Sequence, residues 1–196
     1  MACNTASASA LRKLQQGYLK ARYPERRILG VVVPTIETAL ERGYERIGLI
    51  GTNYTVSSNV FEEELKKINP AIKIYQTATP LLVPLIEYDG REWTGMVLDR
   101  YMAPMLEQGI EALILSCTHY GVLKEEIEVR YGIPVIAQNE IIPAKLEDYL
   151  QRHPEIDGPI TREGRFMLQV TDLTDNYSRA AQALCGQDVL LEKVEL

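Results

Sequence analysis

Segments in which apolar residues recur at helical spacing alternate along this chain with short, continuous apolar runs. The first segment carries its apolar residues on one helical face, at Leu11, Leu14, Tyr18 and Leu19. This spacing predicts a helix over residues 7–21. A β-branched run follows at residues 28–33 and stops at Pro34, so we predict a strand there and a helix over residues 35–42.

The alternation of strand and helix signals continues to the end of the chain. Apolar runs predict strands at residues 46–50, 110–116, 133–137, 165–171 and 189–194. Helical spacing predicts helices at residues 59–68, 91–108, 122–129, 140–150 and 175–184, and residues 51–58 are predicted to form a polar turn. Pro104 should kink or break its helix, because proline lacks the backbone N–H and clashes with the preceding turn.

This order of elements predicts an α/β fold with mostly parallel sheets flanked by helices, since crossover connections cover the strands on both faces. Right-handed crossovers bring the carboxyl ends of all strands to one rim of the sheet, where ligand-binding groups collect. Cys3, Thr52 and Cys117 each follow a predicted strand, or the place where one is expected. A single cleft could therefore hold all three residues.

The composition narrows the classes of partner. Hydrophobic residues make up 46% and charged residues 24% of the chain, as in an ordinary globular protein, and no window has the run of about 18 apolar residues that a membrane span requires. The net charge is −6 without a basic block, so the chain lacks the positive surface that binds nucleic acid. The expected partner is a small molecule or a protein, and not a membrane or a nucleic acid.

Cysteine usage points to a reducing compartment. Cys3, Cys117 and Cys185 cannot all pair within one chain, and no secretory segment precedes them. The cytoplasm is the expected location, because thiols stay free there. Cys185 lies in a predicted helix and is expected to be a small buried hydrophobe. A zinc site made of these three thiols and His119 is an alternative, but the usual closely spaced pair of ligands is absent.

Two segments place a thiol before hydrogen-bonding side chains at a predicted helix start, and they are Cys3-Asn4-Thr5 and Cys117-Thr118-His119. The unpaired N–H groups and the dipole at such a start are expected to lower the pKa of a thiol and favour the reactive thiolate. Inverting an amino-acid α-carbon requires a base that removes the α-proton and an acid on the opposite face that returns one. Two facing thiols would meet this need without a metal or a pyridoxal cofactor.

Four motifs resemble those of the glutamate racemase family, in the same order. They are ACNTASA at residues 2–8, GTxxTVxS at 51–58, PLLVPLIE at 80–87 and CTHY at 117–120. The resemblance covers nearly the whole chain and implies cofactor-independent racemisation of glutamate by two thiols, which supplies D-glutamate for peptidoglycan and thus for cell shape. The alternatives are a racemase for aspartate or another amino acid, and an inactive relative that binds an amino acid without turnover.

The resemblance also implies roles for individual residues. The catalytic groups would be Cys3, Cys117, His119 and Glu87. The substrate would be bound by Asn4, Thr5, Thr52, Thr55, Thr118 and His119. From the residues alone, Thr52 and Thr55 could instead be hydroxyls that cap a helix start, and Glu87 could be a surface residue at a strand end.

Members of the family have two α/β domains with the active site in the cleft between them, and often form dimers. We therefore expect a first domain at residues 1–32 with 135–196, a second at residues 33–134, and a homodimer. The Asp-Ser-Gly and Pro-Tyr-Gly segments of the family, which should precede Cys3, do not occur here, so the first domain is expected to be incomplete. Smaller departures are Gly121 in place of a proline and Gln138-Asn139 in place of Asp-Ser.

Overall fold

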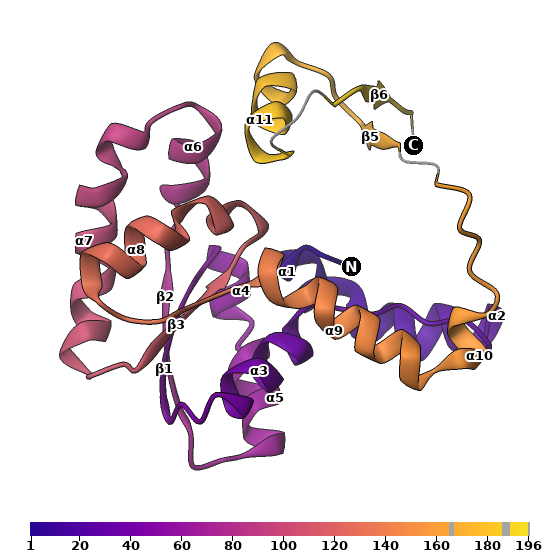
Figure 1. Ribbon diagram of the computed structural model, residues 1–196, viewed down its shortest axis with the longest axis horizontal. Helices are drawn as coiled ribbons and strands as arrows, with labels where there is room; N and C mark the ends of the chain where they lie inside the picture. The colour runs from indigo at the N-terminus through magenta and orange to yellow at the C-terminus, as the bar shows by residue number, and fades with distance from the viewer. Residues whose placement is uncertain (165–166, 186–188, 196) are drawn as a thin grey trace.

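A four-stranded parallel sheet forms the centre of the molecule (Figure 1). The computed structural model describes residues 1–164, 167–185 and 189–195. The strand order is β2-β1-β3-β4, with β1 (Arg46–Gly51), β2 (Lys73–Ala78), β3 (Ala112–Ser116) and β4 (Val135–Ala137). Every pairing in this sheet is parallel, which confirms the α/β class and the strands predicted at residues 46–50, 110–116 and 133–137.

Helices cover both faces of this sheet, and two-sided burial is the reason that its strands are continuous apolar runs. One face packs with α6 (Leu82–Glu87), α7 (Arg91–Glu107) and α8 (Lys124–Tyr131). The other packs with α3 (Val32–Glu41), α5 (Val60–Ile68) and the start of α9 (Gln138–Arg152). Leu49, Ile50, Leu113 and Ile114 are fully buried between the two layers of helices. The sheet is therefore a firm base for the residues at its rim.

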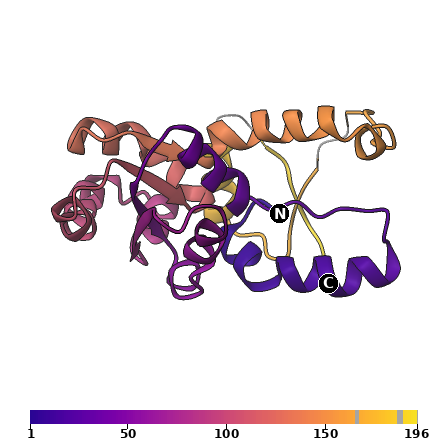
Figure 2. The same cartoon turned by 90° about the horizontal axis from the view of Figure 1, so that it is seen from below.

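The N-terminal helical stretch begins at Asn4 and ends at Arg22. Its consecutive pieces are α1 (Asn4–Ala6), η1 (Ser7–Leu11), η2 (Leu14–Leu19) and α2 (Lys20–Arg22). The helix predicted at residues 7–21 is thus confirmed, although η1 and η2 wind as π-helix, which apolar spacing does not reveal. This stretch and α9 both extend beyond the sheet on the same side (Figure 2).

The strand predicted at residues 28–33 is wrong. Residues 28–30 lie in no strand of the described chain, and Val32 begins α3. Pro34 lies in the first turn of that helix, where a missing N–H costs no intrahelical bond. Val32 and Ile36 are buried against the sheet, so helix packing outweighs the strand preference of the β-branched residues.

Pro104 does not break its helix. The helix α7 continues from Arg91 to Glu107 with Pro104 inside it, so the predicted break is wrong. Leu98, Met102 and Met105 on this helix are buried in the core of one sheet face. Burying these three side chains outweighs the single hydrogen bond that proline removes.

A short helix follows directly after β1, and another follows directly after β3. The helix α4 (Asn53–Ser57) occupies the polar turn predicted at residues 51–58, and the 3₁₀ helix η3 (Thr118–Leu123) stands between β3 and α8. The helices predicted at residues 35–42, 59–68, 122–129 and 140–150 are confirmed as α3, α5, α8 and α9. Helix starts, with their unpaired N–H groups, therefore line the carboxyl-end rim of the sheet.

The end of the chain forms a small unit whose helix contacts α6 (Figure 1). It contains β5 (Leu168–Val170), α11 (Asp175–Cys185) and β6 (Leu191–Lys193), and the two strands pair in parallel. The predicted order of strand, helix, strand is confirmed, while residues 165–166 of the first predicted strand lie outside the described residues. The connection from α9 includes α10 (Pro154–Asp157). In the described part of the chain, no helix has the length and apolar character to cross a bilayer.

Candidate active site

Thr52 and Cys117 lie side by side at the rim because their strands are neighbours. Gly51 at the end of β1 is in register with Ser116 at the end of β3. A Cβ on Gly51 would lie 2.3 Å from the Ser116 hydroxyl oxygen, so this close approach requires glycine. The Ser116 hydroxyl donates to the Ile50 carbonyl at 2.7 Å. The two strands thus deliver Thr52 and Cys117 to one place.

Three threonine hydroxyls join the N-terminal segment to this rim. The Oγ1 of Thr5 lies 2.8 Å from that of Thr52 and 3.4 Å from that of Thr55. Thr52 also caps α4, since its Oγ1 accepts from the Thr55 N–H at 3.2 Å. The helix-capping interpretation of Thr52 is therefore correct, and the same hydroxyl contacts Thr5, 47 positions earlier in the chain.

Asn4 is buried and paired with a residue that the sequence did not suggest. Its Nδ2 donates to the Oε1 of Gln138 at 2.7 Å, and the Nε2 of Gln138 donates back to its Oδ1 at 2.9 Å. The same Nε2 donates to the Thr35 hydroxyl at 3.0 Å. Gln138 follows β4 directly, so its position after a buried strand was a signal that could have identified it.

Cys3 stands at the start of the N-terminal helical stretch. Its Sγ accepts from the Ala6 N–H at 3.5 Å, and the residue is exposed. Because Asn4 and Thr5 are tied to Gln138 and Thr52, Cys3 is held at the rim that also carries Cys117. Negative charge on Cys3 raises the pKa of the Cys117 thiol, as expected for two thiols at the same rim.

Cys117, His119 and Glu87 form a connected chain of polar groups. The Sγ of Cys117 lies 3.8 Å from the Nδ1 of His119, and the Nε2 of His119 lies 2.9 Å from a carboxylate oxygen of Glu87. Glu87 is the last residue of α6, not a strand residue, and is partly buried like His119. Thr118 begins η3 and is exposed. The contact between His119 and Glu87 thus brings together residues 32 positions apart in the sequence.

The expectation of a lowered thiol pKa is wrong for Cys117. Burial raises the pKa of this thiol, because the thiolate loses its hydration, and negative charge on Cys3 and Glu87 raises it further. The backbone N–H of His119 acts in the opposite direction, but does not outweigh burial. Cys117 is therefore mostly a thiol at neutral pH, and it needs a proton acceptor to become a base.

Tyr120 holds the Cys117 segment in place through hydrogen bonds to Thr79. Its hydroxyl lies 2.8 Å from the Thr79 hydroxyl and donates to the Thr79 carbonyl at 3.1 Å. Burial raises the pKa of this phenol above its ordinary value. The Thr79 N–H in turn donates to the Gly51 carbonyl at 2.8 Å. Tyr120 and Thr79 are supporting residues that sequence reasoning missed.

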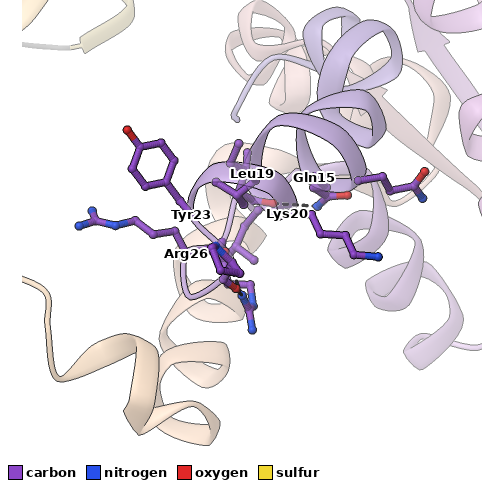
Figure 3. Close-up of a pocket in the computed structure, with 10 residues that line it drawn as sticks. Gln15, Leu19, Lys20, Tyr23 and Arg26 are labelled. Atoms are coloured by element: carbon purple, nitrogen blue, oxygen red, sulfur yellow. Dashed lines mark hydrogen bonds between the residues drawn. The ribbon is translucent and has the colours of Figure 1, made fainter.

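The remaining candidates lie elsewhere. Cys185 is exposed, so the expectation that it is buried is wrong. Among the residues that the structure describes, no group of three His, Cys, Asp or Glu side chains is arranged to hold a metal ion. A hollow of about 650 Å³ lies between the N-terminal helical stretch and residues 26–29, where Gln15 donates to the Ile28 carbonyl at 2.8 Å (Figure 3). Neither thiol at the rim lines this hollow.

The raised pKa of Cys117 predicts its alkylation behaviour. Only the thiolate reacts with iodoacetamide, so the rate at Cys117 should rise with pH through a midpoint above that of an ordinary thiol. In Cys3→Ser the midpoint should move down, because negative charge on Cys3, which opposes the Cys117 thiolate, is gone. Mass spectrometry of each cysteine over a pH series measures both effects.

The control is Cys185 in the same samples. Its alkylation rate at each pH should be equal in the two proteins. A Cys117 midpoint below that of an ordinary thiol, or one that Cys3→Ser does not move, would contradict the electrostatic account.

Comparison with known proteins identifies close resemblances. The family model for Asp/Glu/hydantoin racemases matches residues 1–144. The glutamate racemase of Sulfurihydrogenibium sp. (strain YO3AOP1) is 33% identical over 199 residues, which cover 100% of this chain and 72% of that protein. Both the rim and its thiol segments fall within the matched region.

Solved structures agree with this match. The glutamate racemase of Francisella tularensis subsp. tularensis SCHU S4, in complex with D-glutamate, superimposes with a TM-score of 0.84 at 25% identity, over 98% of this chain and 71% of that one. The glutamate racemase of Thermus thermophilus, in complex with β-chloro-D-alanine, gives a TM-score of 0.75 at 30% identity, over 99% and 70%. The chain spans about 70% of the length of these proteins.

Proposed function

The chain belongs to the Asp/Glu/hydantoin racemase family, and from this premise we propose that it interconverts L- and D-glutamate by proton transfer at two thiols, Cys3 and Cys117. The observation that carries the proposal is the position of two thiol segments at the same rim of the sheet. Two segments 114 positions apart each carry a thiol there, and hydroxyl and amide contacts tie the Cys3 segment to Thr52 and Gln138, which follow the two strands beside β3. The names of the relatives, and the D-glutamate in one of the solved structures, support glutamate as the substrate.

Proton transfer at Cys117 follows from its neighbours. A carboxylate can only accept, so the Nε2 of His119 carries the hydrogen toward Glu87, and the Nδ1 is left as an acceptor for the Cys117 thiol. His119 can therefore take the thiol proton, while Glu87 stabilises the resulting imidazolium. This arrangement offsets the raised pKa of the buried thiol and lets it serve as a base.

The substrate carbon must lie between the two thiols. One thiolate removes the α-proton from one face, and the opposite thiol delivers a proton to the other face, so that the configuration inverts. For the other isomer the two roles exchange. The hydroxyls of Thr5, Thr52 and Thr118, with the N–H groups at the starts of α4 and η3, are suited to hold the substrate carboxylate as charge develops.

Further features of the proposal rest on family membership. We place D-glutamate production in the cytoplasm, in the service of peptidoglycan synthesis, and we expect the chain to act as a homodimer without a cofactor. We also propose two domains on either side of the thiols. Because β4 is paired with β3, the sheet extends past the boundary predicted at residue 134, and we place the division after Ala137.

The test of the proposed function is solvent isotope incorporation. The chain is incubated with L-glutamate in deuterated water, and the product is resolved by chiral chromatography and mass spectrometry. We expect D-glutamate labelled at the α-carbon. L-Aspartate and L-alanine are run in parallel, and a preference for aspartate would replace the substrate assignment. If no amino acid acquires label, the proposed function is wrong.

A further inference from the structure

The first residues of α9 contact both thiol segments. We propose that Gln138 and Asn139 are positioning residues that set the spacing between Cys3 and Cys117. The inference rests on the proposed function for its catalytic consequence, whereas the contacts themselves are independent of it. Gln138 holds the residue next to Cys3, and Asn139 packs on the short helix that follows Cys117.

The contact with the Cys3 segment is a reciprocal pair of amides. Each amide donates to and accepts from the other, and the second N–H of Gln138 is used by Thr35, whose own hydroxyl donates to the Val31 carbonyl at 2.6 Å. Asn4, Thr35 and Gln138 are 2%, 0% and 6% exposed. Water therefore cannot replace a lost bond, and a break would leave buried polar groups unpaired. These hydrogen bonds fix the position of the Cys3 segment relative to β4.

The contact with the Cys117 segment depends on a missing side chain. The Asn139 side chain lies against Gly121 in η3, so that a Cβ on Gly121 would come within 2.6 Å of the Asn139 Oδ1 and 2.9 Å of its Cγ. The next residue of α9, Glu140, accepts from the Lys124 ammonium at 2.7 Å, where η3 passes into α8. The start of α9 is therefore fitted to the segment that carries Cys117.

Both contacts are made by residues that directly follow the end of β4. Ala137 is buried and paired with Leu115 in β3, the strand that delivers Cys117. Gln138 and Asn139 leave this strand in a fixed direction, one toward each thiol segment. Proton transfer is sensitive to such placement, because a shift of about 1 Å can cost about 100-fold in rate. The start of α9 is thus the physical link that determines the distance across which the substrate must fit.

The first measurement does not depend on catalysis. In a Cys185→Ser background, dibromobimane links two thiols and fluoresces only when both have reacted, so it reports the approach of Cys3 to Cys117. We compare the parent with Gln138→Met, which keeps the length but removes the hydrogen bonds, and with Gly121→Ala, which displaces Asn139. Gln151→Ala, at the exposed far end of the same helix, is the matched control.

We expect loss of cross-linking in Gln138→Met and parent-like cross-linking in Gln151→Ala. Gly121→Ala should cause a smaller decrease, because the Asn139 side chain that it meets is exposed and can turn aside. The swapped pair Asn4→Gln with Gln138→Asn keeps the summed length of the two amides and should restore cross-linking. In the isotope assay, Gln138→Met should lower kcat by about 100-fold with little change in KM. If Gln138 had only a structural role, Gln138→Met would change the melting temperature but would not lower kcat selectively over KM.

The outcomes separate the two proposals. If the parent incorporates no label from any substrate while cross-linking depends on Gln138, the proposed function fails and the positioning role stands. If the parent is active and Gln138→Met keeps both kcat and cross-linking, the positioning role is overturned. Unchanged cross-linking in the folded Gly121→Ala variant would overturn the part assigned to Asn139.

Discussion

Replacing either Cys3 or Cys117 with serine should lower the rate of glutamate racemisation by about a thousandfold. A serine hydroxyl occupies nearly the same space as the thiol but holds its proton far more tightly, so one of the two faces of the α-carbon loses its acid or base. Inversion needs a proton-transferring group on each face of the α-carbon. The rate is measured by circular dichroism of the amino acid, with each isomer as the starting substrate.

The two variants should differ in a way that a general loss of structure would not produce. The remaining thiol can still remove a proton from its own face and return one to the same face. Each variant should therefore exchange the α-proton of one isomer with deuterated water, without inversion. Cys3→Ser and Cys117→Ser should act on opposite isomers, and NMR of the α-proton distinguishes them.

The matched control is Cys185→Ser, because Cys185 is exposed and is the last residue of α11, a helix that contacts α6 but carries none of the proposed site residues. This variant should retain the parent rate in both directions. Full racemisation by Cys117→Ser, or exchange of the same isomer by both variants, would contradict the two-thiol mechanism.

Replacing Phe61 with alanine should lower the free energy of unfolding by about 3–5 kcal/mol. Phe61 on α5 is 0% exposed and packs with residues of α3 and of the sheet. The substitution removes a large apolar surface from the core and leaves a cavity that neighbouring helices cannot fill. A loss of this size is a large part of the total stability of about 5–15 kcal/mol that is typical of a folded domain.

Urea denaturation followed by circular dichroism measures this loss. The control is Ile68→Ala on the same helix, because Ile68 is 52% exposed and its substitution should cost less than about 1 kcal/mol. Equal losses in the two variants would show that the packing of α5 on the sheet does not determine stability.

The sequence alone determined where most strands and helices lie. Continuous apolar runs such as residues 46–50 and 110–116 predict buried strands, and buried strands joined by helices predict a parallel sheet. Once the sheet is parallel, the residues after its strands must share a rim. The places of Thr52 and Cys117 therefore followed from local pattern.

Only the tertiary structure decided which distant side chains meet. The pairing of Asn4 with Gln138 joins segments whose separation in sequence carries no signal of contact. The resemblance to the family implied a shared site for His119 and Glu87, but their hydrogen bond is visible only in the fold. Local preference also gave way to packing at residues 28–33, where β-branched residues enter a helix because that helix buries Val32 and Ile36.

The chemistry of Cys117 shows the same division. The sequence placed Cys117 at a helix start and so suggested a lowered pKa. In the structure the thiol is buried, and burial raises its pKa. The physical reason is that periodicity reports the interactions of a residue with its near neighbours in the chain. Desolvation and charge depend on everything packed around the side chain, and that packing exists only in the folded molecule.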